Sequence, residues 1–189
     1  MRVRPRHAAY FGAPRTDMAI HEPTVIPDDT QLEALARDVG NVLAGAGLRL
    51  ATAESCTGGW IAKLVTDVAG SSGWFERGFV TYSNEAKQEL LGVPEGLLEQ
   101  HGAVSEPVVR AMAAGALARS RADLSLAVSG VAGPGGGSAA KPVGTVWLAW
   151  AGAGGESVTR QFHFDGDRDA VRRQAAAVAL EGILSRLSR

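Results

Sequence analysis

Residues 48–68, LRLATAESCTGGWIAKLVTDV, decide the fold of this chain. The stretch starts with a short apolar run without proline, residues 48–53, which predicts a buried central strand. A polar turn with two glycines follows at residues 54–59. Apolar residues then recur at steps of one, three and four from Trp60 to Val68, a spacing typical of a helix that buries one stripe. The segment therefore predicts a strand that turns abruptly into a helix.

The turn at residues 54–59 places the hydroxyl of Ser55 near the expected N-terminus of that helix. Unpaired backbone N–H groups and the positive end of the helix dipole can hold an oxyanion or a phosphate there, so the turn suits a nucleophile. Serine and threonine are also ordinary helix caps, and Gly-Gly is ordinary turn chemistry, which leaves a purely structural role open. The turn is neither the Gly-x-Ser-x-Gly of α/β-hydrolases nor a Ser-x-x-Lys motif.

Composition excludes several classes of protein. The 189 residues, 46% hydrophobic and 21% charged, fit one α/β domain with a real core. A net charge of -1 argues against general nucleic-acid binding but leaves room for a small anionic ligand. Cys56 is the only cysteine and the four histidines are scattered, so we expect no disulfide, no metal site and no cofactor. No apolar run approaches the roughly 20 residues of a membrane span, and we expect a cytoplasmic protein.

The rest of the chain predicts an α/β fold. Residues 1–27 are rich in arginine, proline and glycine and predict a flexible tail, whereas residues 28–189 read as one domain without repeats. Further strands are expected at 77–82, 123–128, 144–150 and 157–164, and further helices at 28–45, 83–91, 94–100, 105–117 and 165–187. We therefore predict a single three-layer domain with a mixed, mostly parallel sheet of about five strands, flanked by helices and ending in a C-terminal hairpin at one edge.

Polar residues follow the ends of several predicted strands. Tyr82, Asn84 and Lys87 come after the second strand and lie at the same edge as Ser55 if the two strands are parallel, the edge where open α/β sheets place ligands. Ser129 opens a glycine-rich loop at residues 129–138, whose N–H groups could cradle an anion. The loop matches neither a Walker nor a Rossmann motif, and a flexible surface loop is the alternative.

The charged and nucleophilic candidates each have a plain alternative. A lysine that acts as a base needs a lowered pKa, and the side chain of Lys87 could reach the turn at residues 54–59. The alternative is a solvent-exposed charge, as most lysines are. Cys56 is the rival nucleophile, but a buried inert thiol is the more common fate of a lone cysteine. Arg168, Arg172 and Arg173 could pair with neighbouring aspartates, which we expect for Arg173.

Five motifs in register resemble the family of CinA C-terminal domains, named after the competence/damage-inducible protein. They are AESCTGG at 53–59, FVTYSNEAK at 79–87, HGAVSE at 101–106, SGVAGP at 129–134 and KPVGTV at 141–146. The match runs from about residue 31 to the C-terminus and includes Gly-Asp-Arg at 166–168. The nucleotide-pyrophosphatase domain that precedes this domain in CinA is not matched, so the chain resembles the stand-alone form.

The resemblance implies a nicotinamide-nucleotide amidohydrolase of pyridine-nucleotide recycling, which converts nicotinamide mononucleotide to nicotinate mononucleotide and ammonia. It also implies three catalytic residues: Ser55 as the nucleophile, Lys87 as the proton acceptor, and Tyr82 between them. The sequence leaves open whether Lys87 or Tyr82 takes the proton. An acyl-enzyme would form on Ser55, and N–H groups of the turn would hold the oxyanion.

The glycine loop, Ser129 and Thr145 would receive the ribose phosphate. The full set of expected substrate-binding residues is Cys56, Thr57, Gly58, Gly59, Asn84, Ser129, Gly130, Gly133, Gly135, Thr145 and Arg168. The chain departs from the pattern at residues 135–137, where three glycines stand at positions that often hold a polar residue.

Two other functions remain open at this point. A non-catalytic nucleotide- or partner-binding module of competence or DNA-damage responses would bind ligand without turnover, and a Ser-Lys amidase could act on another amide. Four tryptophans provide apolar area that a homo-oligomer such as a dimer could bury, namely Trp60, Trp74, Trp147 and Trp150.

Overall fold

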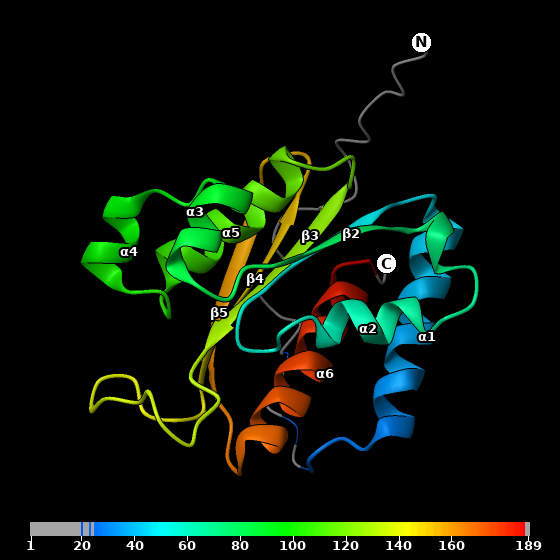
Figure 1. The fold of residues 1–189 in the computed structure, drawn as a ribbon. Coiled ribbons are helices and arrows are strands. Elements are labelled where there is room, and N and C mark those ends of the chain that lie inside the picture. The colour runs from blue at the N-terminus through cyan, green and yellow to red at the C-terminus, as the bar shows by residue number, and fades with distance from the viewer. Residues whose placement is uncertain (1–19, 21–22, 24, 188–189) are drawn as a thin grey trace.

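The computed structural model describes residues 20, 23 and 25–187 of the chain. In order, its elements are α1 (Asp29–Ala46), β1 (Leu50–Glu54), α2 (Trp60–Thr66), the short 3-10 helix η1 (Ser71–Gly73), β2 (Phe75–Val80), α3 (Asn84–Leu91), α4 (Glu95–His101), α5 (Glu106–Ala118), β3 (Leu124–Gly130), β4 (Thr145–Gly152), β5 (Ser157–His163) and α6 (Arg168–Leu187) (Figure 1). The predicted tail at 1–27 lies mostly outside the described residues. Of its described part, Ile20 packs against the core, while Val25 and Ile26 are exposed.

The five strands form one mixed sheet in the order β2-β1-β3-β4-β5. β1 runs parallel to both β2 and β3, and β4 runs antiparallel to β3 and β5. The predicted α/β class is confirmed, with a parallel core of three strands and the β4–β5 hairpin at one edge. β1 is flanked on both sides, which explains its uninterrupted burial and lack of proline.

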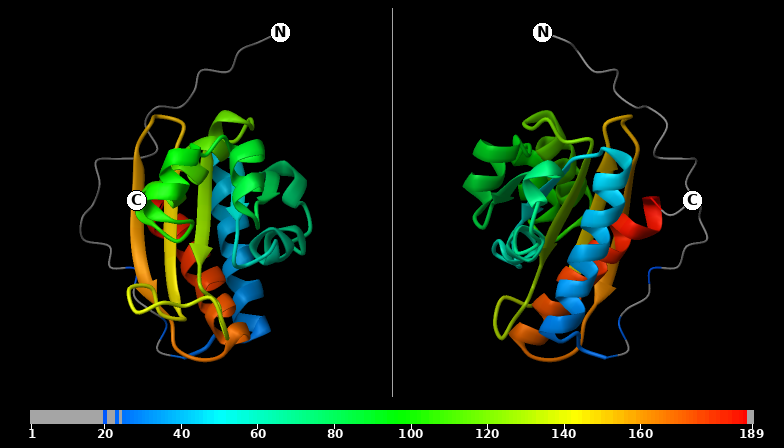
Figure 2. Two further views of the ribbon diagram at one scale, coloured as in Figure 1. Left: turned by 60° about the vertical axis from the view of Figure 1, so that its left-hand side comes forward. Right: turned by 90° about the vertical axis from the view of Figure 1, so that its right-hand side faces the viewer.

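Helices cover both faces of the sheet. α1, α2 and α6 lie on one face, and α3, α4 and α5 lie on the other (Figures 1 and 2). Successive side chains of β1 point to opposite faces of the sheet. Leu50 packs in the apolar cluster under α1, α2 and α6, and Ala51 and Ala53 pack in the cluster under α3, α4 and α5. The central strands present mainly small side chains to α5: Ala127 and Ala149 lie beside the two alanines of β1, and the hydroxyl of Ser125 donates to the Ala113 carbonyl of α5. Small side chains on this face let α5 approach the sheet closely.

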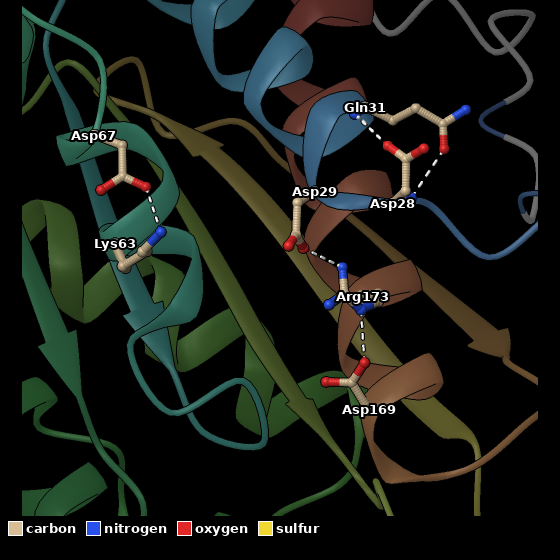
Figure 3. Close-up of polar contacts among 7 residues, drawn as sticks. All are labelled: Asp28, Asp29, Gln31, Lys63, Asp67, Asp169 and Arg173. Carbon is tan, nitrogen blue, oxygen red and sulfur yellow. Dashed lines mark hydrogen bonds and ion pairs between the residues drawn. The ribbon is translucent and has the colours of Figure 1, made fainter.

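Polar contacts join the helices of the first layer. Asp28 forms a capping box with Gln31 at the start of α1, because its side chain accepts from the Gln31 amide while the Gln31 side chain accepts from the Asp28 amide (Figure 3). Arg173 of α6 pairs with Asp169 at 2.6 Å and with Asp29 of α1 at 2.5 Å. The expectation that Arg173 pairs with aspartate is therefore confirmed. None of the helices in the described part is long and apolar enough to span a membrane.

Candidate active site

The carboxyl ends of the three parallel strands meet at one edge of the sheet. Glu54, the last residue of β1, lies level with Val80 of β2 and Val128 of β3. Ser55, Thr81 and the end of β3 therefore come together, as expected from the parallel pairing. The N-terminus of α6 also reaches this edge, since the guanidinium of Arg168 donates to the carbonyl of Gly133 beyond β3.

Ser55 and Lys87 are in direct contact at this edge. The Nζ atom of Lys87 lies 3.1 Å from Oγ of Ser55, and both side chains are buried, with exposed fractions of 1% and 8%. Nζ also donates to the carbonyls of Thr81 (2.8 Å) and Tyr82 (3.2 Å). The hydroxyl of Ser83 caps α3 by accepting from the Ala86 amide, and this start of the helix directs Lys87 inward.

Burial changes the acid–base chemistry of the two neighbours of Ser55. It lowers the pKa of Lys87, because removal from water disfavours the ammonium form. Burial raises the pKa of the Cys56 thiol to about 12. A thiol with that pKa remains protonated near neutral pH, whereas a hydroxyl in contact with a lysine of lowered pKa can transfer its proton. The geometry therefore favours Ser55 over Cys56 as the nucleophile.

The turn that carries Ser55 differs from the prediction in one respect. α2 begins at Trp60, and its first N–H groups are already occupied, because the amides of Gly59, Ile61 and Ala62 donate to the carboxylate of Glu54. The expectation that the N-terminus of this helix holds an oxyanion is therefore wrong. In the described part of the chain, the amides of Cys56 and Thr57 donate to no protein oxygen, so they are the donors left in the turn.

Tyr82 does not stand where the resemblance placed it. Its side chain is 61% exposed, and its phenol oxygen accepts from the guanidinium of Arg168 at 3.1 Å. Only its main-chain carbonyl reaches Lys87. The phenol therefore does not lie between Ser55 and Lys87, and it marks the outer rim of the site instead.

The expected phosphate-binding residues separate into buried and exposed sets. The hydroxyl of Ser129 donates to the Ala103 carbonyl at 2.7 Å, and Thr145 is 2% exposed, so both lie at the base of the glycine loop. Gly130 ends β3, and a side chain there would collide with the carbonyl of Thr145. In contrast, Asn84, Gly58, Gly135 and Arg168 are exposed. Among the described residues, no group of His, Cys, Asp or Glu side chains could hold a metal ion.

The structure gives Glu54 and Arg172 roles in the site that the sequence analysis did not assign to them. Glu54 organises the turn from inside, and the guanidinium of Arg172 donates to the Thr57 carbonyl at 2.8 Å while stacking 4.9 Å over the ring of Trp60. The spacing of Arg172 four residues after Arg168 is the one available signal, because it places both on the same side of a helix. The buried position of Glu54 had no such signal.

Comparison with known proteins shows what the chain is similar to. A family model described as the CinA C-terminal domain matches residues 32–187. Nicotinamide-nucleotide amidohydrolase PncC of Escherichia coli (strain K12) is 63% identical over 153 residues, which cover 81% of this chain and 93% of that protein. The protein of the same name from Pseudomonas putida is 57% identical over 153 residues, with 81% and 95% covered. The crystal structure of competence/damage inducible protein CihA from Agrobacterium tumefaciens gives a TM-score of 0.81 at 45% identity and covers 87% of this chain and 99% of that chain.

Proposed function

This chain belongs to the CinA C-terminal domain family, and we propose that it is a nicotinamide-nucleotide amidohydrolase, a hydrolase acting on an amide C–N bond. One observation carries the chemistry: the hydroxyl of Ser55 lies 3.1 Å from the buried amine of Lys87. The names of relatives that match the chain over most of their length support a nicotinamide nucleotide as the substrate, and within that class we propose nicotinamide mononucleotide.

The reaction that this geometry supports is acyl transfer through serine. Ser55 Oγ attacks the carboxamide carbon of nicotinamide mononucleotide while its proton passes to Nζ of Lys87. The amides of Cys56 and Thr57 stabilise the negative oxygen of the tetrahedral intermediate. The C–N bond then breaks, and Lys87 returns its proton to the departing nitrogen, so that ammonia leaves. Water attacks the resulting ester, and nicotinate mononucleotide is released.

The substrate phosphate would lie between the glycine loop and the start of α6. Arg168 brings a positive charge to this place, where it already contacts Gly133 and Tyr82. Asn84 and the amides around Gly135 would complete the binding site, while Ser129 and Thr145 hold the base of the loop. Residues 28–189 would form the whole catalytic domain.

The decisive experiment is incubation of the purified chain with nicotinamide mononucleotide, followed by measurement of ammonia and nicotinate mononucleotide. We expect turnover by the wild type and by Cys56→Ala, whose main-chain amide is intact, and none by Ser55→Ala. Binding without turnover would favour the binding-module alternative, and turnover only with other carboxamides would favour the second alternative, a Ser-Lys amidase of different specificity.

A homo-oligomer remains part of the proposal, but two of the four tryptophans do not support it. Trp74 and Trp150 are 3% and 0% exposed, because they pack inside the domain. The exposed apolar side chains near the site are Val80, Tyr82 and Leu90. Light scattering of the protein as it elutes from a size-exclusion column would decide between monomer and dimer. A monomer at the concentration of the activity assay would rule the oligomer out.

A further inference from the structure

The carboxylate of Glu54 is fully buried directly before the nucleophile. Five donors converge on its two oxygens. Oε2 accepts from the Thr57 hydroxyl (2.7 Å), the Gly59 amide (3.1 Å) and the Ile61 amide (3.1 Å), and Oε1 accepts from the Ala62 amide (2.8 Å) and the Thr52 hydroxyl (3.5 Å). A carboxylate only accepts hydrogen bonds, with about four lone-pair sites, so this environment matches a carboxylate and no other side chain of that size.

These bonds join the last residue of β1 to the first turn of α2. Residues 54–62 are thereby closed into a ring, with the carboxylate at its centre and Ser55, Cys56 and Thr57 along one side. Two further bonds hold that side from outside: the Ser55 amide donates to the Val128 carbonyl at 3.0 Å, and Arg172 donates to the Thr57 carbonyl. The backbone of residues 55–57, which carries the nucleophile, is therefore held in one conformation.

The ring also determines which amides are left for the substrate. The amide of Ser55 is bound to β3, the amide of Gly58 donates to the Ser55 carbonyl, and the amide of Gly59 donates to Glu54. Within the described residues, only the Cys56 and Thr57 amides of the turn donate to no protein oxygen. The amide that directly follows a nucleophilic serine is also one of the two oxyanion donors in α/β-hydrolases.

We infer that Glu54 is a positioning residue for amide hydrolysis. It fixes the turn so that Ser55 Oγ and the amides of Cys56 and Thr57 all point toward the carbonyl group of the substrate amide. Glu54 does not touch the substrate, because its oxygens are enclosed by the turn. The inference rests on the proposed function, since it assigns a role within that reaction. It implies that the carboxylate acts on the rate of the chemical step and leaves substrate affinity almost unchanged.

Glu54→Gln is the most direct test, because it keeps the length of the side chain and replaces one oxygen by an NH2 group. That group must face at least one of the amide N–H donors of Gly59, Ile61 and Ala62, so the turn has to shift. A shift of about 1 Å at the reacting atoms costs on the order of 100-fold in rate. We expect kcat to fall by about that factor, with KM changed less than threefold. The matched control is Asp67→Asn, which removes the exposed pair with Lys63 on α2 and should retain wild-type kcat.

A second readout does not depend on the identity of the substrate. A small fluorophosphonate reacts with a nucleophilic serine by forming an O–P bond and releasing fluoride, and the phosphoryl oxygen of the reacting group and of the tetrahedral adduct binds the same oxyanion donors. Intact-protein mass spectrometry gives the rate of this labelling. We expect Ser55 labelling in Glu54→Gln to slow by the same order as kcat. Circular dichroism and the melting temperature establish that the variant is folded. If it is not folded, Thr57→Val removes one of the five donors at nearly constant volume and should slow labelling severalfold.

The outcomes separate the two proposals. A folded Glu54→Gln that keeps kcat and the labelling rate within threefold of wild type overturns the positioning role, as does an unchanged labelling rate in Thr57→Val if that variant has to be used. A wild type that is labelled at Ser55 but releases no ammonia refutes the amidohydrolase proposal alone, because slow labelling of Glu54→Gln would still support the role of Glu54.

Discussion

Two loops meet at the carboxyl edge of the sheet, and they are built in opposite ways. The turn at residues 55–57 is buried, and its main chain and side chains are bound to β3, α6 and a carboxylate. The glycine loop is exposed from residue 134 to 140, and its described hydrogen bonds lie at its two ends. Val131 bonds to Thr145 and Gly144, Arg168 donates to Gly133, and Ser138 bonds to Lys141 just beyond the loop. The difference matches the proposed roles, since bond formation needs fixed atoms while a phosphate can be held by an open loop.

The largest expected effect is loss of the nucleophile in the rigid turn. Ser55→Ala should lower the rate of ammonia release by on the order of 10⁴-fold or more, as removal of a serine nucleophile does in hydrolases. The melting temperature should stay close to that of the wild type, because the change removes one oxygen and leaves the main-chain bond from residue 55 to the Val128 carbonyl in place. A Ser55→Ala protein with more than a tenth of wild-type activity would break the assignment of chemistry to this loop.

Removal of the amine should have the next largest effect. Lys87→Met keeps the length and apolar character of the stem but cannot accept a proton, and general-base catalysis contributes about 10²–10⁴-fold. We expect kcat to fall within that range. A matched change of an exposed lysine, Lys63→Met on α2, should leave kcat unaltered. Equal rates for the two variants would show that contact with Ser55 has no catalytic consequence.

The dependence of kcat/KM on pH tests the role of Lys87 as the base in a second way. Lys87 can accept a proton only as a neutral amine, and burial lowers its pKa below the ordinary value of 10.5. The value of kcat/KM should therefore rise about tenfold per pH unit below that pKa and reach its plateau below pH 10.5. The rise should disappear in Lys87→Met. A wild-type profile that is flat from neutral pH downward would contradict a lysine base.

Arg168 contacts the open glycine loop from the start of α6, and its side chain should matter for substrate affinity. Arg168→Gln removes the charge and the bonds to Gly133 and Tyr82. Loss of charge-assisted hydrogen bonds of this kind corresponds to about a tenfold rise in KM. We expect kcat to change little, since Arg168 does not touch the Ser55–Lys87 pair. A fall in kcat at constant KM would place Arg168 in the chemistry instead.

The smallest effect should come from the tip of the loop. A Cβ at Gly135 would meet no protein atom within 4 Å, and Gly135→Ala keeps the main-chain amide that we propose for phosphate binding, so kcat, KM and the melting temperature should be nearly unchanged. Gly133→Ala is the contrasting variant, because Gly133 has φ of 82° and its Cβ would lie 2.6 Å from Val143. It should lower stability by about 1–3 kcal/mol, as measured by chemical denaturation. Similar results for both variants would show that the loop has no fixed shape even at its base.

The two regions also differ in how far the sequence predicts them. The strand ends and the cap at Ser83 are local patterns, so the meeting of Ser55 with Lys87 follows from them once the strands are parallel. The role of Glu54 is not local in this sense. Its partners are amides that become available only because α2 starts at Trp60, and a difference of a few residues in that boundary changes which N–H groups are free. The side-chain direction of Tyr82 likewise depends on Arg168, 86 residues later.

The link from the turn to β3 has a consequence for the order of folding. The amide that anchors Ser55 donates to Val128, and β1 pairs along its whole length with β3, which follows only after α3, α4 and α5. Contacts between segments so distant in the chain form late, since closing a long loop costs entropy before the pairing repays it. A nascent chain that has emerged only as far as α3 carries both Ser55 and Lys87 but lacks the strand that holds the turn. Catalytic competence should therefore appear only once β3 has been synthesised and has joined the sheet.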